Sequence, residues 1–199
     1  MRYRHARIND GYTRAVVIVH GKSEYDIVRH IKSKLRVPIE IYAKDKGQHS
    51  IEISSIMGVL ENQIFQKRKN FLGEYTKIKR ENDDILNIKI FIILDVDSAP
   101  PGTVNKFVNK SMFKDHWLYP YIHPILNDKN LEEALNSIGY TYAKKNSEKS
   151  KYSKIFPVER GKQDKDTIIA LSAALKKTKK SNLDELLDYC LENCPNFGS

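Results

Sequence analysis

Residues 15–28 read AVVIVHGKSEYDIV, and this stretch passes from a strand-like run to a helix-like pattern without a long loop. Ala15–Val19 is short, β-branched and apolar throughout, which is typical of a strand buried on both faces in a parallel sheet. From Ser23, which we predict as the N-cap, apolar residues recur at helical spacing up to Leu35. The stretch therefore predicts a buried strand, a tight turn and a helix in direct succession.

A second buried strand is predicted near the middle of the chain. Residues 88–94 read IKIFIIL, the strongest strand pattern in the sequence, and Asp95 and Asp97 follow it. The Pro-Pro-Gly sequence at 100–102 indicates a loop, so the chain is expected to leave the sheet directly after these two acids. Both predicted strands thus end in residue types that can carry chemistry.

The rest of the chain continues the alternation of strands and helices. We expect a strand at 39–43, a helix over 53–64, an extended segment at 117–126 whose prolines argue against a central strand, and helices at 130–137, at 166–176 and after a Ser181 cap. This order predicts an α/β fold with a mainly parallel central sheet flanked by helices. We assign residues 1–140 to the α/β domain and residues 141–199 to a lysine-rich loop and a C-terminal helical extension packed on it.

The bulk composition is that of an ordinary globular chain. It has 199 residues, of which 40% are hydrophobic and 30% charged. No apolar run approaches bilayer-spanning length, and no signal-peptide core follows the basic N-terminus, so we expect a cytoplasmic protein with no membrane role. Cys190 and Cys194 lie four residues apart without a second Cys/His pair, and we interpret them as small residues on the inner face of a helix.

The charge of the chain favours a polyanionic partner. The formal net charge is +9 and the pI is about 9.4. Basic residues gather in two clusters, Lys144, Lys145, Lys149, Lys151 and Lys154, and Lys176, Lys177, Lys179 and Lys180. Clustered lysines favour nucleic acid, because neutralised phosphates release their counterions. A solvated, lysine-rich surface with no such partner fits the same clusters equally well.

The polar strand ends are the candidate site. In open α/β sheets, ligands bind beside the carboxyl ends of the strands. Two carboxylates at the end of a buried strand repel each other unless a cation neutralises them, and Mg²⁺ suits a site with few carboxylates and a substrate phosphate. Asp95 and Asp97 therefore predict a metal site, the alternative being a polar turn at the strand exit. Gly21, Lys22 and Ser23 open a helix and predict an anion site for phosphate.

These residues together resemble the Toprim domain. In that family a strand runs into a Glu-Gly-Lys-Ser/Thr-Asp/Glu turn that opens a helix, and a later strand ends in Asp-x-Asp. VIVHGKSEYDIV is similar to the first motif and IFIILDVDS to the second, and the resemblance covers about residues 15–132. The domain is shared by type IA and type II topoisomerases, bacterial primases, recombination-repair proteins and nucleases of the OLD type. The sequence HGKS is not a Walker A loop, because it lacks the earlier glycine of that motif, so we do not expect ATP hydrolysis of the Walker A type.

The resemblance implies a Mg²⁺- or Mn²⁺-dependent nuclease acting on DNA or RNA. It implies Asp95, Asp97 and Glu132 as metal ligands, with Glu24 and Lys162 as auxiliary catalytic residues; Glu132 and Lys162 are assigned by their order along the chain. Stand-alone proteins of this size resemble components of antiphage defence systems and mobile elements. That setting implies a homodimer or a partner protein of a defence system.

One departure from the family pattern stands at the centre of the first motif. The chain has His20 where the family has glutamate. Histidine either replaces the glutamate by moving a proton, shifts the metal towards Mn²⁺ by binding it through a ring nitrogen, or marks a site that has lost catalysis. The alternative function is therefore a catalytically impaired nucleic-acid- or partner-binding module. A phosphatase of the HAD type shares Asp-x-Asp, but Ala99 and the mid-chain position of the motif count against it.

Overall fold

A computed structural model describes residues 11–82, 84–96, 99–140 and 163–195 of the chain. Its centre is a four-stranded sheet in the order β2-β1-β5-β6, and every neighbouring pair in it is parallel. The strands are β1 (Ala15–Val19), β2 (Ile39–Tyr42), β5 (Lys89–Asp95) and β6 (Ile122–Asn127), and a small antiparallel hairpin is formed by β3 (Arg80–Glu81) and β4 (Asp84–Ile85).

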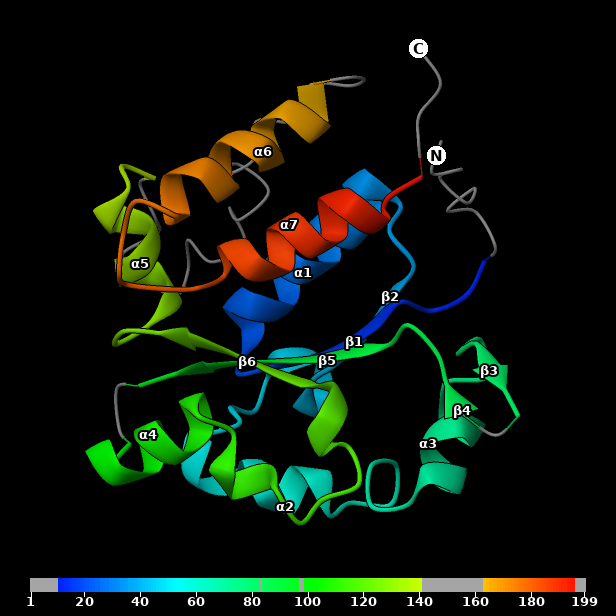
Figure 1. Cartoon of the computed structure of the whole chain (residues 1–199). Coiled ribbons are helices and arrows are strands. Elements are labelled where there is room, and N and C mark those ends of the chain that lie inside the picture. The colour runs from blue at the N-terminus through cyan, green and yellow to red at the C-terminus, as the bar shows by residue number, and fades with distance from the viewer. Residues whose placement is uncertain (1–10, 83, 97–98, 141–162, 196–199) are drawn as a thin grey trace, which may run out of the picture.

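Helices cover both faces of the sheet, as Figure 1 shows. One layer contains α1 (Lys22–Leu35), α5 (Leu131–Ser137), α6 (Gln163–Leu175) and α7 (Asp184–Asn193). The other contains α2 (Ile56–Leu60), α3 (Arg68–Glu74) and α4 (Pro101–Val108). Short 3₁₀ turns lie at Lys44–Gly47, Ile53–Ser55, Ser111–Phe113 and Tyr119–Tyr121. The predicted α/β fold with a parallel sheet flanked by helices is confirmed.

The apolar strands divide their side chains between two cores. Val17 and Val19 of β1 pack with α1, α6 and α7, whereas Val16 and Ile18 pack with the α2–α4 layer. All five residues of β1 are fully buried. A strand covered on both faces needs no polar alternation, which is why the run reads as continuously apolar. Residues from α6 and α7 belong to the same core as α1.

The predicted helix over 53–64 is wrong in its extent. A 3₁₀ turn precedes α2, and α2 itself ends at Leu60. The Oδ1 atom of Asn62 accepts hydrogen bonds from the backbone N–H groups of Ile64 and Phe65, and its Nδ2 donates to the Tyr42 hydroxyl. The side chain thus replaces the helical bonds of the next turn and ends the helix.

The Pro-Pro-Gly sequence forms part of a helix, not only the predicted loop. Pro101 is the first residue of α4. Its fixed backbone angle suits the first helical turn, where the missing N–H group has no intrahelical partner to lose. The extended segment predicted at 117–126 contains β6, which lies at the edge of the sheet, where its proline, Pro124, is tolerated.

Membrane insertion finds no support in the helices of this structure. Within the described parts of the chain, every helix is too short or too polar to cross a lipid bilayer.

A loop after β2 packs backbone to backbone against the turn between β1 and α1. Gly47 has φ of +87°, and a Cβ atom there would lie 2.8 Å from the Lys22 Cα and 2.9 Å from the Gly21 carbonyl carbon and oxygen. Beyond it, the Ile51 N–H donates to the His20 carbonyl at 2.8 Å. A Cβ at Gly21 would meet only ordinary contacts. The close backbone contact at this turn therefore depends on the missing Cβ of Gly47 and not on that of Gly21.

We expect Gly47→Ala to destabilise the protein by roughly 2 to 4 kcal/mol, because the methyl group adds a backbone overlap to an unfavourable positive φ. The control is Gly58→Ala, since Gly58 lies within α2 with nothing within 4 Å of the added carbon. Alanine should stabilise that helical position by up to about 1 kcal/mol. Urea unfolding of the three proteins measures both effects, and equal effects would contradict the packing described.

Candidate active site

The candidate site lies at the carboxyl edge of the sheet, between β1 and β5. The register pairs Val19 with Ile93, so the residues that follow both strands emerge side by side. The chain leaves β1 into α1 on one face of the sheet and leaves β5 towards α4 on the other (Figure 1). Ligand sites in α/β sheets form at such a switch in direction. The fold therefore brings both predicted motifs to one edge.

The first turn of α1 is built around the carboxylate of Glu24. Gly21 is the N-cap, and its N–H donates to Glu24 Oε2 at 3.1 Å. The prediction that Ser23 is the N-cap is wrong, because the helix begins at Lys22. The Ser23 hydroxyl instead donates to Glu132 Oε1 at 2.9 Å. Glu24 is only 2% exposed, and its second oxygen, Oε1, is buried without a hydrogen-bond partner.

The pKa of Glu24 is raised well above its ordinary value of 4.5. Burial is the largest cause, because removal from water disfavours the charged carboxylate. The negative charges of Asp95 and, to a smaller extent, Glu132 act in the same direction, and the backbone N–H groups of Glu24 itself and of Gly21 oppose them. The carboxylates of Asp95 in β5 and Glu132 in α5 thus lie close enough to Glu24 to disfavour its charge.

Asp95, the last residue of β5, is held by a chain of hydrogen bonds. It is 5% exposed, and its Oδ1 accepts a hydrogen bond from Asn127 Nδ2 at 2.9 Å. Asn127, the last residue of β6, is fully buried, and its Oδ1 accepts from the Ser181 hydroxyl at 2.7 Å. The Ser181 hydroxyl also accepts from the Leu183 N–H at 3.0 Å. The orientation of Asp95 therefore depends on a residue between α6 and α7.

The side chain of His20 faces Asp95 across the same edge. Its Nδ1 lies 2.9 Å from the carbonyl oxygen of Ile51, and its Nε2 lies 3.9 Å from Asp95 Oδ2. The imidazole is largely buried, with 13% of its side chain exposed. His20 is thus fixed by the loop after β2 and directed towards the carboxylate cluster.

The other predicted site residues divide into two groups. Lys22 binds Asp26, one turn further along α1, with 3.1 Å between Nζ and Oδ1. Its charge therefore lies along the helix surface and is shared with an acid. Asp97 and Lys162, predicted as a metal ligand and a catalytic residue, lie outside the described residues.

One oxygen atom at this edge has the chemistry of a cation ligand. Within the described ranges, no three His, Cys, Asp or Glu side chains are gathered closely enough to hold a metal ion together. The unpartnered Oε1 of Glu24 is nevertheless a hard oxygen donor, buried beside Asp95 and Glu132. Carboxylate oxygens of this kind are the ligands that Mg²⁺ and Mn²⁺ accept.

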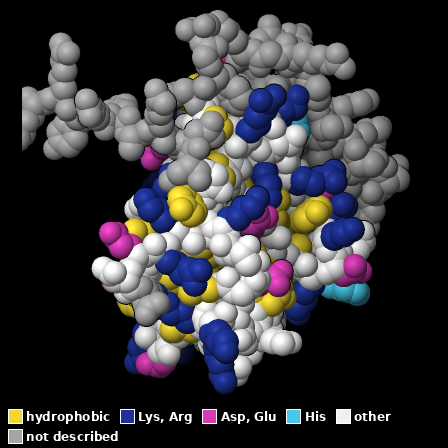
Figure 2. All heavy atoms as spheres, turned by 90° about the vertical axis from the view of Figure 1, so that its right-hand side faces the viewer, with side chains coloured by type: hydrophobic (Ala, Val, Ile, Leu, Met, Phe, Trp, Pro, Cys, Tyr) yellow, Lys and Arg dark blue, Asp and Glu magenta, His cyan; other side chains and the backbone are white. Residues whose placement is uncertain are grey.

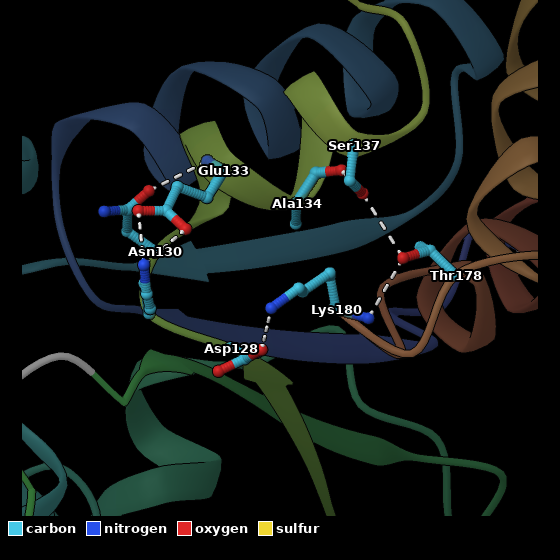
Figure 3. Close-up of polar contacts among 8 residues, drawn as sticks. Asp128, Asn130, Glu133, Ala134, Ser137, Thr178 and Lys180 are labelled. Atoms are coloured by element: carbon cyan, nitrogen blue, oxygen red, sulfur yellow. Dashed lines mark hydrogen bonds and ion pairs between the residues drawn. The ribbon is translucent and has the colours of Figure 1, made fainter.

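The segment between α6 and α7 was not predicted to take part in the site. Ser181 forms an antiparallel bridge with Asn127, and Asn182 Oδ1 accepts from the Leu126 N–H at 2.8 Å. Figure 3 shows the neighbouring contacts, in which Lys180 reaches Asp128 and the Thr178 hydroxyl meets that of Ser137. No local sequence pattern links residue 181 to residue 127, because the contact depends on the packing of distant elements.

The lysine clusters are partly neutralised where the structure describes them. Lys176 binds Asp188 at 2.6 Å, and Lys180 binds Asp128. Lys177 and Lys179 are exposed. The cluster predicted at 144–154 lies outside the described residues.

Comparison with known proteins gives no relative from which a role can be transferred. The chain matches no protein-family model, and no curated protein sequence or solved structure is significantly similar to it. The geometry and chemistry of the site therefore carry the functional argument alone.

We expect Glu24→Gln to stabilise the protein at pH 7 by an amount on the order of 1 kcal/mol, the usual size of a single-residue effect, because the folded protein holds this carboxylate in a site that disfavours its charge. Glutamine keeps an acceptor for Gly21 but carries no charge. Because the folded-state pKa of Glu24 is raised, the wild type loses stability as the pH rises above 4.5 towards that pKa. The difference between the two proteins should therefore be small below pH 4.5 and grow above it.

This comparison is made by urea unfolding in a buffer that contains a chelator. Glu133→Gln is the control, because Glu133 lies one residue from Glu132 but bears its ion pair with Lys129 on the surface. Its effect should stay within about 0.5 kcal/mol. A destabilising Glu24→Gln substitution would show that the carboxylate serves the fold and is not held there for a ligand.

We also expect Ser181→Ala to destabilise the protein by about 1 to 3 kcal/mol, because the buried Asn127 oxygen and the Leu183 N–H both lose their partner. Ser33→Ala is the matched control, since Ser33 is exposed on α1. Thermal unfolding of both variants makes the comparison. Equal, small effects would contradict a structural link between this loop and Asp95.

Proposed function

We propose that the protein is a Toprim-like, Mg²⁺- or Mn²⁺-dependent nuclease that hydrolyses phosphodiester bonds of DNA or RNA. The observation that carries the proposal is the unpartnered, buried Oε1 of Glu24 beside Asp95 and Glu132. A protein that buries an acid against like charges loses stability, and such arrangements gather at functional sites. A divalent cation relieves this repulsion.

Each residue of the edge then has a task. Glu24, Asp95 and Glu132 would hold the cation, together with Asp97, which stays a prediction from the sequence. The cation would supply an activated water and neutralise charge on the phosphate. The Asn127–Ser181 chain keeps Asp95 in one orientation, and Ser23 does the same for Glu132. The N-terminal end of α1 favours an anionic substrate at this edge.

The charge of the protein supports a polyanionic substrate. The net charge is +9. Figure 2 shows the side of the molecule away from the site, where Lys and Arg side chains are spread among hydrophobic and a few acidic ones. A net positive charge accelerates association with nucleic acid but does not select a sequence. As part of the same proposal, we place the protein in the cytoplasm, in an antiphage defence system or mobile element, where it acts as a homodimer or with a partner protein.

A second candidate function is a nucleic-acid- or partner-binding module without catalysis. One observation favours it: the described residues do not form a group of three acids or imidazoles gathered for metal binding. The presence of His20 at the position of the family's glutamate points in the same direction.

The test is cleavage of labelled single- and double-stranded DNA and RNA with Mg²⁺ or Mn²⁺. We expect at least one substrate to be cut, and Asp95→Ala to lower the cleavage rate by more than about 100-fold. Substitution of a residue that only supports a metal ligand already lowers activity by about 10- to 100-fold. Asp115→Ala is the control, because Asp115 is exposed and lies outside the site; it should keep the wild-type rate.

Three results would contradict the nuclease proposal. Salt-sensitive binding without cleavage, under either metal, would establish the binding module. Cleavage that survives Asp95→Ala would show that the activity belongs elsewhere or to a contaminant. Turnover of p-nitrophenyl phosphate, lost in Asp95→Asn and without any nucleic-acid cleavage, would establish a phosphatase.

A further inference from the structure

The contact of the His20 ring with Ile51 sets which of its two nitrogens donates a hydrogen bond. The Nδ1 atom lies 2.9 Å from the Ile51 carbonyl oxygen, which can only accept a hydrogen bond. Nδ1 therefore carries the proton. The Ile51 N–H donates to the His20 carbonyl at 2.8 Å, and Ile51 is fully buried, so both the backbone and the ring of His20 are anchored to the same residue. In the neutral ring, Nε2 then holds the lone pair.

The Nε2 atom lies at the same edge of the sheet as the carboxylate oxygens. Nε2 lies 3.9 Å from Asp95 Oδ2, a separation longer than a hydrogen bond. Glu24 Oε1 lies buried at the same edge, beside Asp95 and without a partner. The edge thus combines one nitrogen donor with carboxylate oxygens, and the nitrogen is oriented by a backbone carbonyl behind it, as is usual for metal-binding histidines.

We propose that His20 Nε2 is a cation ligand and that it makes the site selective for a first-row transition-metal ion, with Mn²⁺ as the test case, over Mg²⁺. Mg²⁺ prefers an all-oxygen shell, whereas Mn²⁺ accepts both imidazole nitrogen and carboxylate oxygen. The inference rests on the proposed function of this edge as a cation site. It gives His20 the role of a ligand, in place of a proton shuttle or a remnant of a lost site.

The test uses the full chain loaded with one equivalent of Mn²⁺. It measures how nearby nitrogen nuclei modulate the electron spin echo of the bound Mn²⁺. We expect a ¹⁴N coupling that changes to the ¹⁵N pattern when the protein is labelled with ¹⁵N-histidine. His20→Asn should abolish it, because the asparagine amide can still donate to Ile51 but offers no nitrogen lone pair. His49→Asn is the control, since His49 lies in the same loop but is exposed, and it should keep the coupling.

Calorimetric titration gives a second readout that needs no catalysis. We expect His20→Asn to weaken Mn²⁺ binding by at least about tenfold and to leave Mg²⁺ binding almost unchanged. His20→Glu should reverse the preference by strengthening Mg²⁺ binding about tenfold. Circular dichroism and thermal unfolding show whether each variant is folded, and the His20→Glu gain cannot arise from misfolding.

The outcomes separate this inference from the nuclease proposal. Bound Mn²⁺ without nitrogen coupling, the absence of Mn²⁺ binding, or equal Mn²⁺ and Mg²⁺ affinities would overturn the role of His20, even if the protein cuts nucleic acid. A pH-rate profile altered by His20→Asn with unchanged Mn²⁺ binding would also overturn it and make His20 a proton shuttle. Histidine-coupled Mn²⁺ in a protein that cleaves nothing would support the inference and refute the nuclease.

Discussion

The parallel pairing of β1 with β5 is the constraint on which the rest of the structure depends. It aligns Val19 with Ile93 and thereby sets His20 and Asp95 at one edge. Both strands are buried on both faces, and alternate residues feed two separate cores. A slip of one residue would exchange these two sets of side chains, so the register is strongly specified. The position of the site therefore follows from hydrophobic packing, while its chemistry comes from the polar residues that end the strands.

The polar groups at this edge are organised in layers of support. Glu24 is fixed by Gly21, Asp95 by Asn127, Glu132 by Ser23 and His20 by Ile51. Each functional group thus has a partner that sets its direction, and most of these partners are themselves buried. Such support narrows the geometry of a site before any ligand arrives, and it is what precise recognition of a cation or a phosphate requires.

The sequence alone predicted the parts of the structure that depend on local patterns. The strands Ala15–Val19 and Lys89–Asp95 follow from continuous apolar runs, and α5 follows from the helical spacing of its apolar residues. The end of α2 at Leu60 was missed because an Asx turn at Asn62 overrides an apolar helical face. Asn127 and Ser181 were missed for a different reason: their roles arise from contacts between distant segments, and neither carries a motif.

The segment after α6 also determines which edge of the sheet is accessible to a strand of another chain. By bridging Asn127 with Ser181 and bonding Leu126 through Asn182, it lies along the C-terminal part of the outer edge of β6. An uncovered edge strand is a template for a strand of another chain. In the described part of the molecule, strand addition is thus blocked on the β6 side, next to the candidate site, and any growth of the sheet by association would have to use β2. The same few residues that orient Asp95 therefore also guard the protein against edge-to-edge aggregation beside its own site.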